Sequence, residues 1–181
     1  MASPARTQLV MTMRSLAERT AALAAPVATG YTLRAYRPGD EPAWVEIINS
    51  VGDLGQWTLP RALSEVVASP NFDAEGLFFA VCGDHAVGTA CVWWGAPGGA
   101  SIGALHMVAV HPEHQGHGLG YAVCLAVLQR FAQQGTPEVR LLTDDHRLAA
   151  VRIYWRLGFR PLLTADDHAA RWEAIRALQI Y

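Results

Sequence analysis

Lysine is absent from this sequence, because all 14 basic residues among its 181 residues are arginines. A Schiff-base enzyme and a phosphate-binding Walker loop both need a lysine, so both are excluded. Cysteine is scarce: Cys82, Cys91 and Cys124 lie in apolar runs and form no C-x-x-C pair, which argues against a disulfide framework. We expect buried, reduced thiols and therefore a cytoplasmic location.

Charged residues and long apolar runs are also few. Only 17% of the residues are charged and the formal net charge is −2, so no basic surface for nucleic acid is predicted. No apolar run reaches the roughly 18 residues of a membrane span, and no membrane partner is expected. The G-x-S-x-G elbow of serine hydrolases is missing. A chain of this length is expected to form a single core.

Residues 1–29 are predicted to form an N-terminal arm ahead of a domain of residues 30–181. This segment is rich in alanine and carries Arg6, Arg14 and Arg19 against a single acid. A basic, acid-poor start is also typical of a transit peptide. We favour an arm that packs on the domain.

The sequence is organised around residues 106–134, which predict a strand, a tight turn and a helix. The β-rich apolar run of residues 102–110 predicts the strand. Residues 119–134 then predict a helix that Gly135 ends.

Three glycines, Gly116, Gly118 and Gly120, separate that strand from that helix. Glycine lets the backbone approach a ligand without a Cβ atom in the way. The first amides of a helix are unpaired and carry partial positive charge, so a phosphate is the expected ligand. The G-x-G-x-G spacing differs from the G-x-G-x-x-G of dinucleotide folds.

The loop and a later segment together resemble the GCN5-related N-acetyltransferases. Gln115-x-x-Gly118-x-Gly120 is similar to the family's acetyl-CoA loop, and A-V-R-I-Y-W-R-L-G-F, ending at Phe159, is similar to its A-x-x-x-Y-x-x-x-G-F segment. The run L-T-D-D-H-R-L-A-A-V-R-I-Y also resembles the acetyltransferase domains of mycothiol synthase-like proteins. The resemblance implies an α/β fold with a central, mostly antiparallel mixed sheet, a splayed strand pair and flanking helices.

The remaining patterns predict elements that suit this fold. Expected strands cover residues 31–36, 76–82, 86–94, 139–143 and 159–163, and expected helices cover residues 41–49, 59–68 and 147–157. The letters of residues 169–179 favour a helix, whereas the resemblance favours a final strand, which we adopt.

Acetyl-CoA is the cosubstrate that the resemblance implies. In the family the pantetheine arm follows the strand here formed by Val108, Ala109 and Val110, and the amide matching that of Val108 faces the thioester carbonyl. Arg147 stands where many members have Asn, and it either contacts a CoA phosphate or is solvated. The pyrophosphate is assigned to the loop residues Gln115, Gly116, His117, Gly118, Leu119 and Gly120.

Tyr154 and His106 are the catalytic candidates. Tyr154 occupies the position of the family's general-acid tyrosine and would protonate the departing thiolate; its alternative is a packed tyrosine with a satisfied hydroxyl. Strand alternation puts His106 on one face with Ala104, Val108 and Val110, toward the cofactor. A histidine pKa of about 6.5 suits proton removal, and the alternative is a buried histidine with a structural hydrogen bond.

Histidines also gather near the loop, at positions 106, 111, 114 and 117. Imidazole is a common zinc ligand, but neither an H-E-x-x-H helix nor a cysteine partner accompanies them. No metal is therefore expected.

The expected acceptor is a small-molecule amine or a peptide. Trp57, Trp93 and Trp94 would suit a hydrophobic amine, and Asp53 and Asp84 a cation, although neither clue outweighs ordinary packing. In the resembled family, residues near Asp53, Gln56 and Trp57 shape the acceptor pocket. The alternative function is a non-catalytic acyl-CoA sensor, and the sequence leaves open whether the chain forms a homodimer.

Overall fold

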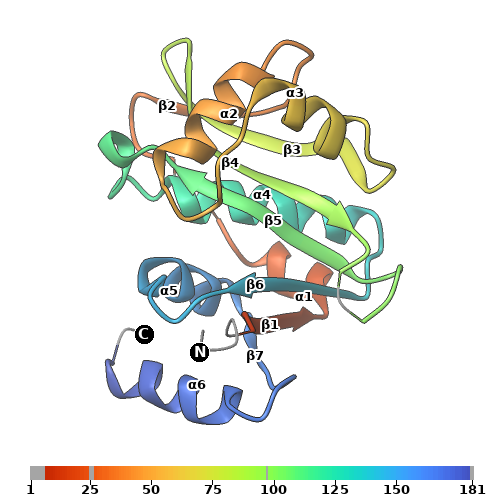
Figure 1. Ribbon diagram of the computed structural model, residues 1–181, viewed down its shortest axis with the longest axis vertical. Helices are drawn as coiled ribbons and strands as arrows, with labels where there is room; N and C mark the ends of the chain where they lie inside the picture. Colours follow the sequence, from red (N-terminus) through yellow and green to blue (C-terminus); the bar gives the residue numbers. More distant parts are fainter. Residues whose placement is uncertain (1–6, 25–26, 97, 180–181) are drawn as a thin grey trace, which may run out of the picture.

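Seven strands form one sheet with helices on both faces (Figure 1). A computed structural model describes residues 7–24, 27–96 and 98–179. The strands are β1 (Leu9–Arg14), β2 (Tyr31–Ala35), β3 (Phe72–Cys82), β4 (His85–Trp94), β5 (Gly103–Val110), β6 (Glu138–Thr143) and β7 (Arg160–Leu162). The helices are α1 (Leu16–Ala21), α2 (Glu41–Ser50), α3 (Leu59–Ala62), α4 (Leu119–Gln133), α5 (Leu148–Leu157) and α6 (His168–Ala177). A π-helical turn, Leu63–Val67, continues α3, and a 3-10 turn, Pro112–His114, follows β5.

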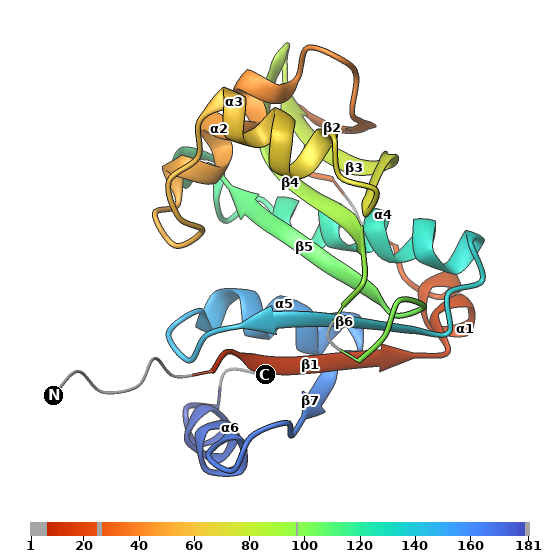
Figure 2. The ribbon, with the colours of Figure 1, turned by 45° about the vertical axis from the view of Figure 1, so that its right-hand side comes forward.

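The strand order is β2-β3-β4-β5-β6-β1-β7, and every neighbouring pair is antiparallel except β5 with β6. The parallel pair is joined only by Gly103 with Val139 and Ala104 with Arg140. Beyond these two pairs the strands diverge toward their carboxyl ends, as Figure 2 shows. The splayed, mostly antiparallel sheet that the resemblance implies is therefore confirmed.

Two hydrophobic cores lie on opposite faces of the sheet. In Figure 1, α4 runs behind β4 and β5, where its Phe131 and Leu128 are fully buried. Helices α2 and α3 cover the other face, where Trp44, Ile47 and Ile48 pack at helical spacing. No helix in the described ranges is long and apolar enough to cross a membrane.

Residues 9–14 of the predicted N-terminal arm form an inner strand of the sheet. Strand β1 lies between β6 and β7, and Leu9, Met11 and Met13 are at most 1% exposed. Their alternation is the pattern of a strand with one buried face, and the prediction of an arm did not take this pattern into account. Residues 1–6 and 25–26 of the predicted arm lie outside the described residues.

The predicted final strand at residues 169–179 is wrong, because this segment forms α6. Its alanine-rich letters favour a helix, and Trp172 and Ile175 share one buried helical face. The edge of β6 that a C-terminal strand could have joined is taken by β1, which pairs with β6 from Leu9 to Arg14.

Candidate active site

A cavity of 410 Å³ lies where β5 and β6 diverge. Its walls come from β4, β5, β6, α5, the loop between α2 and α3, and the residue ahead of β1. Four of the predicted site residues line it, namely His106, Val108, Arg147 and Tyr154. The other lining residues are Gln8, Asp53, Leu54, Trp93, Gly95, Ala96, Ala104, Leu105, Met107, Arg140, Leu141 and Leu142.

A β-bulge interrupts β5 inside this cavity. Cys91 pairs with His106 and Thr89 with Ala109, so β5 has one more residue than β4 between these pairs. Met107, in the bulge, has a φ of 49°, the left-handed region that costs a non-glycine residue on the order of 1 kcal/mol or more. Neither Met107 nor Val108 belongs to the ladders that β5 forms with β4 and β6.

The bulge makes one sequence prediction wrong: His106 does not share a face with Val108 and Val110. An extra residue shifts the alternation by one and moves the following side chains to the opposite face. Val108 and Val110 pack against the core of α4, whereas the His106 ring lies 5.4 Å from that of Trp93, which packs with the core of α2. His106 and Val108 nevertheless both border the cavity.

Burial lowers the pKa of His106 to about 4, so its imidazole is neutral near pH 7. No residue in the described part of the chain forms a hydrogen bond with this ring. The alternative of a histidine held by a structural hydrogen bond has no partner among these residues, and the ring borders the cavity.

Tyr154 lies in α5 with 3% of its surface exposed, and its ring packs 6.1 Å from that of Phe159. Burial raises its pKa, as does the neighbouring Cys124 thiol, while the Arg147 guanidinium acts in the opposite direction. The phenol therefore keeps its proton at neutral pH. A protonated hydroxyl that borders a cavity can donate a hydrogen bond to a ligand.

The glycine loop joins the end of β5 to α4 as predicted. Gly116 and Gly118 have φ angles of 84° and 76°, and Gly118 caps α4. A Cβ atom on Gly120 would lie 3.1 Å from Ile153 Cδ1, so this glycine allows α4 to approach α5. The Gln115 side chain donates to the Val110 carbonyl at 3.1 Å and ties the loop to β5. The first amides of α4 lack intrahelical acceptors, which fits an anion.

The histidines of the loop contact their own surroundings. His114 Nδ1 lies 3.0 Å from the Tyr31 hydroxyl, and His117 Nδ1 lies 3.0 Å from the Gln115 carbonyl. Within the described ranges, no group of three or more His, Cys, Asp and Glu side chains is arranged to hold a metal ion.

The middle of the chain matches a known family. Residues 44–159 match the Acetyltransferase (GNAT) family. The chain belongs to this family. That membership confirms the resemblance carried by the glycine loop and by the segment of Tyr154, and it supports the class of acyl-CoA-dependent N-acyltransferases.

This GNAT chain spans about half the length of the curated relatives that it matches. It is 37% identical over 135 residues to a mycothiol acetyltransferase of Streptomyces scabiei, covering 72% of this chain but 43% of that relative. A GCN5-related N-acetyltransferase of Sphaerobacter thermophilus has a similar structure, with a TM-score of 0.67, 26% identity, and coverage of 87% of this chain and 50% of that one. A Mycobacterium tuberculosis protein solved with CoA shares the fold, with a TM-score of 0.56, 20% identity, and coverage of 82% and 85%.

Gln8 was not predicted to line the site, and the three candidates in the loop between α2 and α3 take different places. Gln8 lines the cavity because β1 is an inner strand, and the alternation of β1 was the available signal. Asp53 also lines the cavity. Trp57 instead packs edge-on against Trp44 at 5.3 Å, and Gln56 is exposed, with its carbonyl bound by Arg61.

Proposed function

We propose that this chain transfers an acetyl group from acetyl-CoA to a primary amine by direct transfer in a ternary complex. One observation carries the proposal: a single cavity is bordered by a tyrosine that keeps its proton and by a histidine that lacks one. Amine acylation needs such an acid and such a base in one place.

The residues around the cavity fit acetyl-CoA. The amides at the start of α4 and the loop of Gly116 to Gly120 would hold its pyrophosphate. The pantetheine arm would follow Val108, Ala109 and Val110, where pairing with β6 has ended. The Val108 amide, outside both ladders, would donate to the thioester oxygen as it gains negative charge, an interaction worth about 10²–10³ in rate.

Proton transfers then follow from the two side chains. The amine nitrogen must be neutral to attack, and the His106 imidazole accepts the proton that it releases as the new C–N bond forms. The C–S bond breaks, its electron pair stays on sulfur, and the Tyr154 hydroxyl supplies the proton that yields the free thiol. Solvent exchange restores the proton of Tyr154 and removes that of His106.

The acceptor is proposed from the relatives and from the cavity wall. Curated relatives are named mycothiol acetyltransferase, so amines related to mycothiol are the first acceptors to assay. Trp93 and Met107 offer apolar contacts, and Asp53 offers a carboxylate to a cationic group.

Tyr154→Phe tests the proposal because it removes the acidic proton and keeps the buried ring. We expect the turnover number, measured by thiol release with an amine, to fall about 100-fold, while the acetyl-CoA Kd measured by titration calorimetry stays unchanged. Tyr121→Phe, a half-buried tyrosine of α4 that does not line the cavity, is the matched control.

Each other result has a definite meaning. An unchanged turnover number would remove Tyr154 from the mechanism. Acetyl-CoA binding without thiol release for any amine would favour the sensor alternative. Absence of acetyl-CoA binding by the unmodified chain would refute the proposal as a whole.

A further inference from the structure

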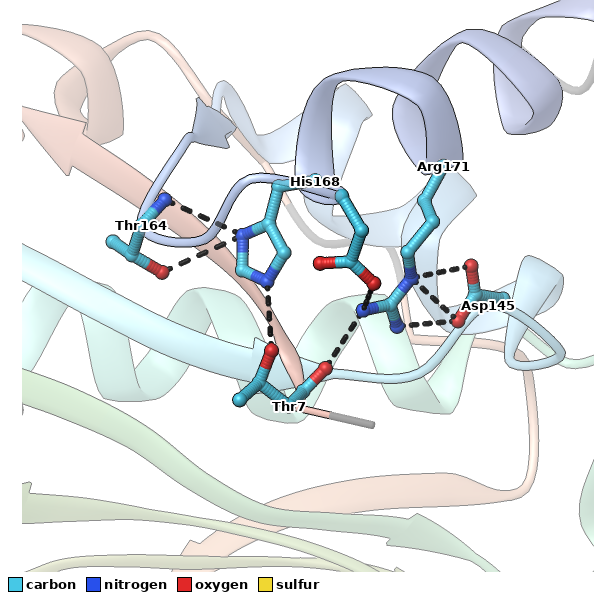
Figure 3. Close-up of polar contacts among 6 residues, drawn as sticks. Thr7, Asp145, Thr164, His168 and Arg171 are labelled. Carbon is cyan, nitrogen blue, oxygen red and sulfur yellow. Dashed lines mark hydrogen bonds and ion pairs between the residues drawn. The ribbon is translucent and has the colours of Figure 1, made fainter. Parts of the chain in front are cut away.

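A buried arginine on α6 connects three segments of the chain that lie far apart in the sequence. Arg171 is 8% exposed and bonds Asp145, ahead of α5, and the backbone of Thr7, ahead of β1 (Figure 3). It also pairs with Asp167, the residue that precedes its own helix, at 3.2 Å. Arg171 lies outside residues 44–159, the part of the chain that matches the family.

The contact with Asp145 is bidentate. Arg171 Nε donates to Asp145 Oδ1 at 2.9 Å, and Nη2 donates to Oδ2 at 2.5 Å. Two parallel charge-assisted bonds fix orientation as well as distance, and a lysine cannot reproduce them. The hydrogen bonds with Asp145 raise the pKa of Arg171, which stays charged at every pH of interest.

The contact with Thr7 is reinforced by a second buried side chain. Arg171 Nη1 donates to the Thr7 carbonyl at 2.8 Å. His168, fully buried, has its Nδ1 3.4 Å from the Thr164 amide and its Nε2 3.4 Å from Thr7 Oγ1 (Figure 3). Since Nδ1 accepts from an amide, the neutral ring carries its proton on Nε2 and donates to Thr7.

Both anchored segments continue directly into the cavity wall. Gln8 follows Thr7, and Arg147 stands two residues after Asp145; both line the cavity. The segments are also joined to each other, because Gln8 Nε2 donates to Asp144 Oδ2 at 3.0 Å and the Arg147 amide donates to the Asp144 carbonyl at 3.1 Å. A displacement of Asp145 would therefore move Gln8 and Arg147 together.

Arg147 offers positive charge to a ligand in the cavity. Among the described residues, no carboxylate forms an ion pair with its guanidinium, whereas Arg140 on the same wall pairs with Glu138. Its charge reaches the reacting region, since it acts on Tyr154. In the proposed function, this cation would pair with an anionic or carbonyl group of acetyl-CoA.

We propose that Arg171 is a positioning residue that holds Arg147 and Gln8 against the cavity so that they bind acetyl-CoA. The inference rests on the proposed function, because it takes acetyl-CoA as the ligand. Arg171 touches no reacting atom and acts through Asp145 and Thr7.

A double-mutant cycle on acetyl-CoA binding tests this role. Arg171→Lys keeps the charge but loses the bidentate geometry. We expect it to weaken acetyl-CoA binding about fivefold, by titration calorimetry, in the otherwise unmodified chain. In an Arg147→Ala background the same change should weaken binding less than about twofold, because the charged group through which it acts is gone and only the uncharged Gln8 remains.

The cycle distinguishes positioning from stability. Equal losses in both backgrounds would overturn the proposal, since Arg171 would then act independently of Arg147. Asp145→Asn should reproduce the result and replaces Arg171→Lys if that variant does not fold. Arg176→Lys, on the same helix in an exposed pair with Glu173 at 3.8 Å, is the control and should bind normally.

The outcome also separates this inference from the proposed function. If the unmodified chain binds acetyl-CoA and Arg171→Lys binds it equally well, the positioning role alone fails. If the unmodified chain does not bind acetyl-CoA, both proposals fail.

Discussion

The two halves of the sheet are built differently. In one half, β2, β3, β4 and β5 are paired in chain order, and β3 and β4 form a hairpin through Gly83. In the other half, β6 pairs with β1, a strand from near the start of the chain, and Thr143 lies opposite Leu9. Local pairing in the first half contrasts with distant pairing in the second.

The cavity lies between these halves and takes one catalytic candidate from each. His106 belongs to the locally paired half and Tyr154 to the other, and the ladder that joins the halves consists of two residue pairs. The distance between acid and base therefore depends on the short junction at Gly103 and Ala104, more than on the longer ladders of either half.

The largest expected effect comes from breaking that junction. A Cβ atom on Gly103 would lie 2.4 Å from the fully buried Phe131 ring, so Gly103→Ala must change the packing of β5 against α4, which we expect to shift the strand. We expect the free energy of unfolding, from urea denaturation, to fall by about 2 kcal/mol, which is typical of overpacking. Because β5 moves relative to β6, acetyl-CoA binding should weaken as well.

A clash inside one half is the control for this prediction. A Cβ atom on Gly76 of β3 would lie 2.6 Å from Val92 Cβ, so Gly76→Ala should also destabilise the fold. It should leave acetyl-CoA binding unchanged, since Gly76 belongs to β3, which pairs with neither β5 nor β6. Equal weakening of binding by both variants would show that the junction has no special role.

The difference between the halves also explains how far the sequence could be interpreted. Helix α2, the β3–β4 hairpin and the strand-loop-helix unit from β5 to α4 follow from local patterns, and all were predicted. The segment of Tyr154 was placed correctly because its apolar spacing and Gly158 define a helix and its end.

Three features depend on distant pairing and were not predicted. The insertion of β1 beside β6 requires a partner some 130 residues away in the sequence, and no local signal names that partner. The bulge at Met107 results from the register of β4 against β5. Its positive φ could not be predicted, because the residue at this position is not a glycine. The contacts of Arg171 join α6 to Thr7 and Asp145, so its role became visible only in the structure.

A smaller effect is expected at the two ends of α4, the helix that packs on the strands of the locally paired half. Gly118 caps the helix start with a φ of 76°, and Gly135 follows its end with a φ of 69°; at both positions the methyl group of an alanine would meet open space. Alanine in either left-handed position costs about 1 kcal/mol of stability. Only Gly118→Ala should reduce acetyl-CoA affinity, about tenfold by calorimetry, because it displaces the amides assigned to the pyrophosphate. A similar loss for Gly135→Ala would mean that general destabilisation, and not the loop, is responsible.

The smallest effect concerns the proton of His106. Its pKa is about 4 in the folded chain, against about 6.5 for an unfolded histidine, so between these values the unfolded state binds a proton that the native state does not. Stability contributed by the neutral ring is thus present above pH 6.5 and is lost as the pH falls toward 4. His106→Gln should flatten the dependence of the unfolding free energy on pH in this window, whereas His85→Gln, at an exposed position of β4, should retain it. An unchanged slope in His106→Gln would show that the native ring takes up its proton in the same pH window as the unfolded ring, so that burial does not lower its pKa.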